Sequence, residues 1–259
     1  MARTSDQGNG GSGAPVPWWP RVRRTTHLPL DRSELLRVAD SLVTSGIRSV
    51  AISSVFSPVN ADMEQEAAAI LLEQLPSLHV SLSHEIGRMG LLERENATII
   101  NASLRELADH VCRGLTETLA KAGFEAPLFL SQNDGTLMDV EYAREHPVAT
   151  FASGPTNSMR GAMFLSGPET CAVVDVGGTT SDVGILQGGF PHEATAEVSV
   201  GGIRTNFRMP DVLSVGIGGG SRIRADGGDV TVGPDSVGFR LREQALVFGG
   251  SELTATDLR

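Results

Sequence analysis

Two aspartates flank a short run of glycines and hydroxyl side chains in the segment CAVVDVGGTTSDVGILQGG, residues 171–189. The apolar residues before Asp175 and after Asp182 predict two strands joined by a turn. Gly177 and Gly178 would let backbone N–H groups approach phosphate oxygens closely. The two carboxylates could hold a hydrated Mg²⁺ ion that bridges the same oxygens. The pattern therefore predicts a phosphate-binding hairpin, and the hydroxyls of Thr179 and Thr180 favour this interpretation.

Two common nucleotide-binding loops do not fit this hairpin. A dinucleotide-binding Rossmann turn is excluded because the G-x-G-x-x-G spacing is missing and a strand follows the glycines where that motif needs a helix. A Walker-type loop needs a lysine after its last glycine, and Lys121 is the only lysine in the chain. An ordinary glycine hairpin with two solvated aspartates stays open as the structural alternative.

A second candidate anion site lies at SGPTNS, residues 153–158. The sequence predicts a strand ending in SGP and a helix beginning near Thr156. The free N–H groups of a helix N-terminus attract anions, and Arg160 is close in sequence. Gly154 and Thr156 are therefore candidate cofactor-binding residues, with a simply capped helix start as the alternative.

The polar loop GGIRTNFRMPD, residues 201–211, is the third candidate. Its two arginines and one amide, Arg204, Asn206 and Arg208, could bind a carboxylate or a phosphorylated intermediate through paired hydrogen bonds. A solvated surface loop is the alternative.

The composition narrows the classes of ligand. The 259 residues carry a formal net charge of -10 without basic runs in the body of the chain, which argues against a nucleic-acid or anionic-membrane partner. No stretch approaches the roughly 18 consecutive apolar residues of a membrane span. Two cysteines and six scattered histidines give neither a disulfide framework nor a zinc site. We expect a cytoplasmic protein with a small substrate.

Helical and strand-like segments alternate before the strand-rich part that follows Asp175. The expected helices are 31–46, 60–76 and 92–122, and the expected strands between and after them are 50–56, 79–83 and 127–132. This order predicts an α/β fold with a mixed sheet. The expected divisions are a Gly-, Ser- and Pro-rich lead-in over 1–26, a first region over 27–150 and a second region over 151–259.

Three strings make the sequence similar to a known family: SGPTNSMRGAMFLSG, VVDVGGTTSDVGILQGGFP and VGGIRTNFRMPDVLSVGIGGGS. They resemble the hydantoinase/oxoprolinase A family, which includes N-methylhydantoinases, 5-oxoprolinases and subunits of acetone and acetophenone carboxylases. The weaker strings VFSPVNADMEQEAA, ERENATIINASL and SQNDGTLM also fit. The resemblance covers nearly everything from Leu28 onward.

The resemblance implies an actin-like ATPase fold, in which two ribonuclease-H-like lobes close over ATP and Mg²⁺. It also implies ATP-dependent hydrolysis of a cyclic amide of the hydantoin or 5-oxoproline type, through phosphorylation of the carbonyl. The residues that match the phosphate loop of the family's second lobe are Asp175, Gly177, Gly178, Thr179, Thr180 and Asp182, with the two aspartates as catalytic and metal-binding groups. Gly219 resembles an adenosine-side glycine of the superfamily. Partners would be a companion B-type subunit or further copies of the chain.

Two departures from the family pattern bear on function. No Asp-x-Gly-Gly-Thr string of a first lobe precedes Leu28, and family members continue beyond the point that corresponds to Arg259. We therefore expect a truncated member with an incomplete two-lobe fold: a central piece of a longer enzyme, a truncated gene product or a degenerate paralogue. A non-catalytic actin-like binding or assembly module is the main alternative to the hydrolase. A sugar or acetate kinase would share the hairpin but not the strings SGPTNSMRGA or RTNFRMPDVLS.

Overall fold

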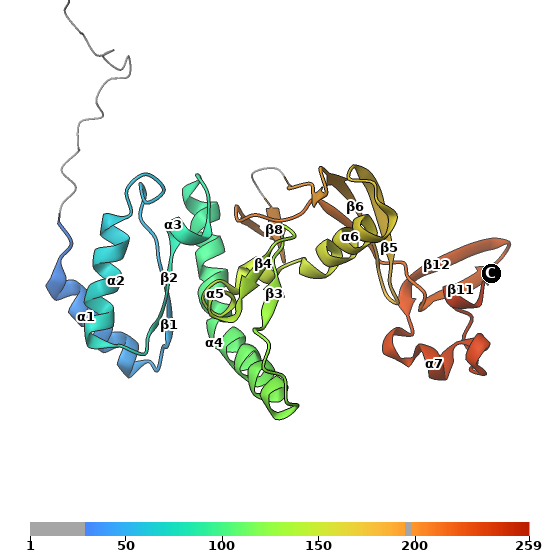
Figure 1. The fold of residues 1–259 in the computed structure, drawn as a ribbon, viewed down its shortest axis with the longest axis horizontal. Helices are drawn as coiled ribbons and strands as arrows, with labels where there is room; N and C mark the ends of the chain where they lie inside the picture. The colour runs from blue at the N-terminus through green and yellow to red at the C-terminus, as the bar shows by residue number, and fades with distance from the viewer. Residues whose placement is uncertain (1–28, 195–197, 259) are drawn as a thin grey trace, which may run out of the picture.

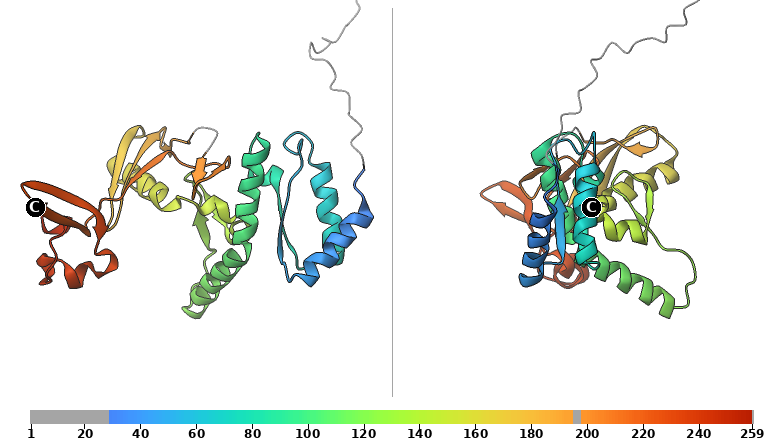
Figure 2. Two further views of the ribbon diagram at one scale, coloured as in Figure 1. Left: turned by 180° about the vertical axis from the view of Figure 1, so that it is seen from behind. Right: turned by 90° about the vertical axis from the view of Figure 1, so that its left-hand side faces the viewer.

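The computed structural model describes residues 29–194 and 198–258. The described elements follow one another along the longest axis of the molecule, from α1 and α2 at one end to β11 and β12 at the other (Figure 1). The view from behind shows the same succession, with the long helix α4 between the first strands and the later sheet (Figure 2). The expected lead-in over 1–26 lies outside the described residues.

The first unit is a small helix-and-strand layer. Helix α1 (Arg32–Thr44) leads to β1 (Ser49–Ile52), and α2 (Asp62–Gln74) carries the chain back so that β2 (His79–Leu82) pairs with β1 in parallel. The carboxylate of Asp31 accepts hydrogen bonds from the amides of Ser33 and Glu34 and so caps the N-terminus of α1. Leu42, Leu71 and Leu78 form the buried core of this layer.

The 31-residue helix α4 (Leu91–Lys121) is the central support of the described structure. It follows the single-turn helix α3 (Ser83–Ile86) and ends before Gly123, whose φ of 81° suits a glycine at that position. Ala97 near its start packs with Val148 and Phe207, so α4 draws together segments that are more than 50 residues apart in sequence. Helix α4 occupies the expected range almost to the residue.

The segment before SGP differs from the expected strand. After the hairpin of β3 (Phe129–Ser131) and β4 (Leu137–Asp139) come α5 (Val140–Glu145) and a 3-10 turn, Pro147–Thr150. Helix α6 (Ser153–Ser166) then begins three residues earlier than expected. Pro155 falls in its first turn, where a missing N–H breaks no intrahelical bond, so the proline fits inside the helix.

The predicted hairpin belongs to a four-stranded antiparallel sheet with β6 at its centre and β5 at its edge. Strand β5 (Cys171–Val176) pairs with β6 (Ser181–Gln187), which also pairs with β10 (Val212–Val215) and the short β7 (Phe190–Pro191). Helix α6 covers one face, since a Cβ on Gly184 would overlap the sulfur of Met159. On the opposite face the apolar side chains of Val174, Val176 and Leu213 are more than half exposed.

Short elements complete the described chain. Strands β8 (Val198–Val200) and β9 (Ile203–Thr205) form one antiparallel pair, and β11 (Ser221–Asp226) and β12 (Asp229–Ser236) form another. Helix α7 (Leu241–Gln244) and the 3-10 turns Gly238–Arg240, Leu246–Phe248 and Ala255–Asp257 close the fold. Within the described ranges, no helix is long and apolar enough to cross a membrane.

A buried ionic network joins α2, α3 and α4. The fully buried carboxylate of Glu64 accepts hydrogen bonds from the Ser54 amide at 2.7 Å, from the Ser83 hydroxyl at 2.5 Å and from the ring of His84 at 2.8 Å. The guanidinium of Arg94 is 1% exposed and donates to Ser83 Oγ and to the Ser54 carbonyl. Burial opposes the ionisation of Glu64, but hydrogen bonds from Ser83 and His84 outweigh it and hold the pKa of Glu64 below its usual value.

We predict that Glu64→Gln lowers the free energy of unfolding at pH 7 by about 3 kcal/mol, because Arg94 would keep its buried charge without a counter-charge. The pKa of Glu64 is lower in the folded state, so its contribution is present above the unfolded pKa of about 4.3 and is lost as pH falls through the folded pKa. The difference between variant and wild type should therefore shrink in acid. Urea unfolding at several pH values measures it.

Glu66→Gln on the exposed side of the same helix is the matched control and should change stability by less than about 0.5 kcal/mol. Equal stability of the Glu64 and Glu66 variants at pH 7 would contradict the structural role given to the network.

Candidate functional site

The two predicted aspartates lie side by side on the sheet. Asp175 of β5 and Asp182 of β6 are directly opposite in the antiparallel register, so both side chains point to the face that α6 covers. Ser214 on β10 is opposite Asp182 and donates a hydrogen bond to its carboxylate. Like charges directly opposite on neighbouring strands repel, and a cation between them would remove that cost.

The tip of the hairpin presents unused backbone donors. The Gly177 amide closes the turn by donating to the Thr180 carbonyl at 2.9 Å. The amides of Gly178, Thr179 and Thr180 have no acceptor within the described residues, and all three residues are exposed. Successive free N–H groups can bind an anion where they point into one space. The tip thus combines donors for an anion with the neighbouring carboxylate pair.

Glycines 218–220 pack backbone against backbone on this tip. The amides of Gly219 and Gly220 donate to the carbonyls of Gly177 and Gly178, at 2.9 and 2.6 Å. A Cβ on Gly218 would lie 2.7 Å from the Gly177 oxygen, closer than real side chains come. The structure therefore places Gly219, an expected cofactor-binding residue, where it holds the hairpin tip.

The SGP segment contributes differently from the expectation. Thr156 is fully buried, and its hydroxyl donates to the carbonyls of Asn133 and Ala152 at 3.2 and 3.0 Å. Its side chain ties α6 to the β3–β4 turn and is not open to a ligand. Gly154 is exposed in the first turn of α6, with open space where a Cβ would stand. In the described part of the chain, no hydrogen bond or ion pair joins this turn to the hairpin tip.

The three polar residues expected to bind substrate have separate surroundings. Asn206 is 2% exposed, and its amide donates to the carbonyls of Arg88 and Met89 at 3.1 and 2.9 Å, so it fixes the backbone before α4. Arg204 forms an ion pair with Glu93. Arg208 remains 61% exposed and reaches a pocket. The structure thus keeps Arg208 available to a ligand and gives Asn206 a structural role.

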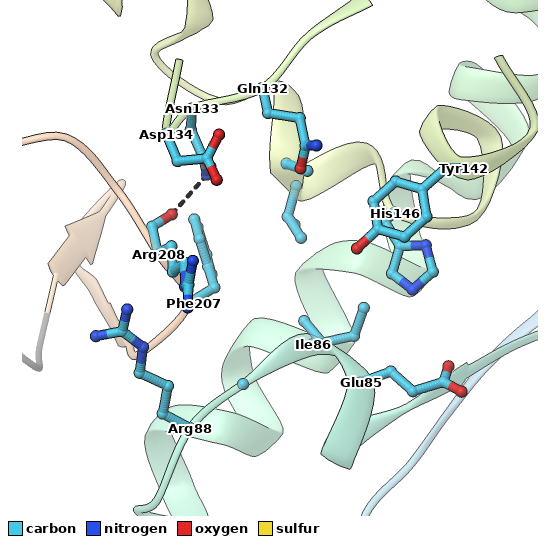
Figure 3. Close-up of a pocket in the computed structure, with 13 residues that line it drawn as sticks. Glu85, Ile86, Arg88, Gln132, Asn133, Asp134, Tyr142, His146, Phe207 and Arg208 are labelled. Carbon is cyan, nitrogen blue, oxygen red and sulfur yellow. Dashed lines mark hydrogen bonds between the residues drawn. The ribbon is translucent and has the colours of Figure 1, made fainter. Parts of the chain in front are cut away.

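That pocket has a volume of about 320 Å³ and lies between α3, the β3–β4 turn, α5 and the segment after β9 (Figure 3). Arg88, Tyr142 and His146 line it together with Arg208. The sequence did not reveal these three residues as a site, because they come from segments up to 120 residues from Arg208 and show no shared motif. Only the structure shows that the segment of Arg88 and the segment of Arg208 lie next to each other, joined by Asn206.

Comparison with known proteins supports the fold. The crystal structure of ATP-dependent caprolactamase from Pseudomonas jessenii resembles this chain with a TM-score of 0.70 and 28% identity, over 88% of this chain and 34% of that one. The nucleotide-free structure of acetone carboxylase gives a TM-score of 0.61 at 23% identity. The expected α/β actin-like ATPase fold is confirmed, and the chain spans part of it. The expected mixed sheet is not found in the described residues, because β1 and β2 form a separate parallel pair and the other named strands pair antiparallel.

Sequence comparison gives the same group of proteins. The chain is 28% identical to caprolactamase subunit alpha of Pseudomonas jessenii over 234 residues, and 27% identical to 5-oxoprolinase 1 of Arabidopsis thaliana. In both cases 88% of this chain is covered, but only 34% and 18% of the relative. The chain thus spans about a third of the length of the caprolactamase subunit.

Two family models match the sequence. Residues 21–75 match the hydantoinase/oxoprolinase N-terminal region, and residues 94–259 match hydantoinase/oxoprolinase. The second match alone covers more than half of the chain and includes the hairpin with its carboxylate pair. The chain belongs to the hydantoinase/oxoprolinase family.

Proposed function

We propose that this chain supplies one side of the ATP site of an enzyme that opens a cyclic amide, with the β5–β6 hairpin as the phosphate-binding element. The observation that carries the proposal is the set of three free amides at the hairpin tip beside two directly opposed carboxylates. Caprolactamase, a relative with the same fold, is described as ATP-dependent, and its name specifies a lactam. Both facts favour ATP and a cyclic amide as ligands.

The carboxylate pair suits Mg²⁺. Mg²⁺ is commonly held by one or two protein carboxylates, several waters and the phosphates of a nucleotide. Asp175 and Asp182 offer two carboxylates on one face, and the bond from Ser214 orients the second. The described residues contain no group of three or more such ligands, which matches an ion shared with a nucleotide better than a closed protein site. When bound, Mg²⁺ would neutralise charge on the phosphates.

The residues of this chain would act by positioning and charge. The free amides of Gly178, Thr179 and Thr180 would donate to phosphate oxygens, and the packed glycines 218–220 would keep the tip from shifting when the anion binds. Transfer of the terminal phosphoryl group to the amide oxygen breaks its bond to ADP. One water would then add to the activated carbon, and cleavage of the C–N bond would leave an acyl phosphate. A second water would hydrolyse that acyl phosphate to the carboxylate and inorganic phosphate.

A companion subunit is part of the proposal. The relative of Pseudomonas jessenii is named as an alpha subunit, so it works with at least one other polypeptide. The phosphate-binding hairpin would contact ATP from one side only. Other segments of polypeptide would have to make the remaining contacts with ATP. We propose that the cyclic amide is opened only when those contacts are complete.

We predict that Asp175→Asn weakens Mg²⁺-dependent ATP binding at least tenfold while leaving the fold as stable as before or slightly more stable. Removal of one carboxylate ends the repulsion with Asp182, a gain of up to about 0.5 kcal/mol, but also removes half of the cation site. Calorimetric titration of the full chain with ATP and Mg²⁺, together with thermal unfolding, measures both effects. Asp229→Asn at the exposed start of β12 is the control.

A second variant addresses the amides. A Cβ at Gly178 would meet no atom within 4 Å in the free protein, so we expect the fold to tolerate Gly178→Val. The added side chain would keep phosphate oxygens away from the tip amides, and ATP affinity should fall about tenfold or more. Unchanged affinity in both the Asp175 and the Gly178 variants would refute the assignment of the hairpin.

We further predict that residues 1–259 alone do not open 5-oxoproline or hydantoin in an ATP-dependent way above background. Phosphoryl transfer requires ATP to be held in line with the carbonyl, which contacts from one side do not achieve. Chromatographic measurement of the ring-opened product with and without ATP tests this, with a full-length family member as positive control. Robust turnover by this chain would contradict the one-sided site.

A further inference from the structure

The glycine segment that packs on the hairpin tip also contacts the end of the described chain. The 3-10 turn Ala255–Asp257 follows Thr254, which forms an isolated bridge with Arg222 of β11 in the red part of Figure 1. Thr256 in this turn donates twice to one acceptor: its amide at 2.9 Å and its hydroxyl at 2.8 Å both bond to the Gly219 carbonyl. Thr256 therefore contacts a glycine that itself bonds to the tip.

A capping box fixes this turn. One oxygen of the Asp257 carboxylate accepts hydrogen bonds from the amide and the hydroxyl of Thr254, at 2.7 and 2.8 Å. The other oxygen accepts from the Val247 amide at 2.6 Å, which ties the turn to the preceding 3-10 turn. Thr254 is fully buried. Since Thr256 lies between the two residues of the box, its donors are held against Gly219.

One peptide unit connects Thr256 with the tip. The Gly219 carbonyl and the Gly220 amide belong to the same planar trans unit, so they point in opposite directions. The carbonyl accepts the two bonds from Thr256, and the buried amide donates to the Gly178 carbonyl at 2.6 Å. The unit is therefore held between the C-terminal turn on one side and the hairpin tip on the other.

The next peptide unit gives the direction of a free amide. The Gly178 carbonyl and the Thr179 amide share a trans unit, so the amide points away from the glycine segment to which the carbonyl is bonded. Thr179 is exposed, and its amide has no acceptor within the described residues. Consecutive hydrogen bonds polarise one another, so each bond that a carbonyl accepts makes the N–H of its unit a better donor. A series of hydrogen bonds thus leads from Thr256 to an amide that is free to bind an anion.

We infer that Thr256 is a positioning residue of the phosphate-binding tip: its two bonds to the Gly219 carbonyl, held by Asp257, direct the Thr179 amide toward a phosphate of the nucleotide. The identity of the anion rests on the proposed function. The positioning itself rests on the series of hydrogen bonds. Thr256 follows Gly219 by 37 residues, so the sequence did not indicate this role.

The test compares Thr256→Ala with Thr256→Ser, because both variants lose the threonine methyl group and only serine keeps the hydroxyl. Without nucleotide, the Gly220 amide should exchange its hydrogen about fivefold faster in Thr256→Ala than in Thr256→Ser, the factor that one net hydrogen bond gives. NMR-detected hydrogen exchange on the full chain measures this. Calorimetric titration with ATP and Mg²⁺ should show about fivefold weaker binding to Thr256→Ala, and binding to Thr256→Ser within about twofold of wild type.

Thr150→Ala is the matched control. The Thr150 hydroxyl also donates to a backbone carbonyl from a 3-10 turn, that of Pro147 at 2.7 Å, but this bond lies outside the hairpin and the glycine segment. Thr150→Ala should change neither the exchange of the Gly220 amide nor the affinity for ATP.

Two results would overturn the inference. One is equal exchange of the Gly220 amide in the alanine and serine variants of Thr256. The other is faster exchange with unchanged ATP affinity, while Asp175→Asn still weakens ATP binding. ATP affinity that neither Asp175→Asn nor Gly178→Val lowers would instead refute the hairpin as the ATP site, and with it the role of Thr256 toward phosphate. The exchange comparison made without nucleotide would then still decide whether Thr256 holds the tip.

Discussion

The N-terminal half of the described structure depends on the hydrogen bonds that the buried carboxylate of Glu64 accepts. An ion of this kind is tolerated inside a protein only when hydrogen bonds replace its lost water, and donors from the loop after β1 and from α3 do so here. Arg94 completes the network from α4 through Ser83. The loop after β1, the short helix α3 and the first turn of α4 are thereby held in one arrangement.

The same arrangement sets one wall of the pocket. The backbone at Gly87 lies against the side chains of Asn206 and Arg94. A Cβ there would be 2.5 Å from Asn206 and 2.7 Å from Arg94. Asn206 then fixes the carbonyls of Arg88 and Met89, which carries the segment after β9 against the start of α4. The position of the Arg88 side chain is thus a consequence of buried polar contacts that reach back to Glu64. Buried polar groups cost free energy when they lack partners. Here their hydrogen bonds determine where the Arg88 side chain lies at the surface.

The hairpin tip follows a different physical principle. Its position is fixed by backbone contact with glycines 218–220, and the amides of residues 178–180 make no hydrogen bond within the described residues. Side chains at those glycines would push the two segments apart. The carboxylate pair costs some stability because Asp175 and Asp182 repel across the strands. Binding sites typically sacrifice some folding stability at the functional residues and are held in place by rigid neighbouring structure.

The sequence by itself determined the local elements and the hairpin. Helical periodicity predicted α4, and the apolar residues before Asp175 and after Asp182 predicted β5 and β6, because such signals depend on neighbours in the chain. The start of α6 was misplaced because a proline in the first helical turn also fits a strand end. Tertiary structure alone decided the roles of Thr156, Asn206 and Gly219 and assembled the pocket around Arg88 and His146. Those outcomes depend on which distant backbone carbonyls and rings come into contact, and no spacing in the sequence encodes such contacts.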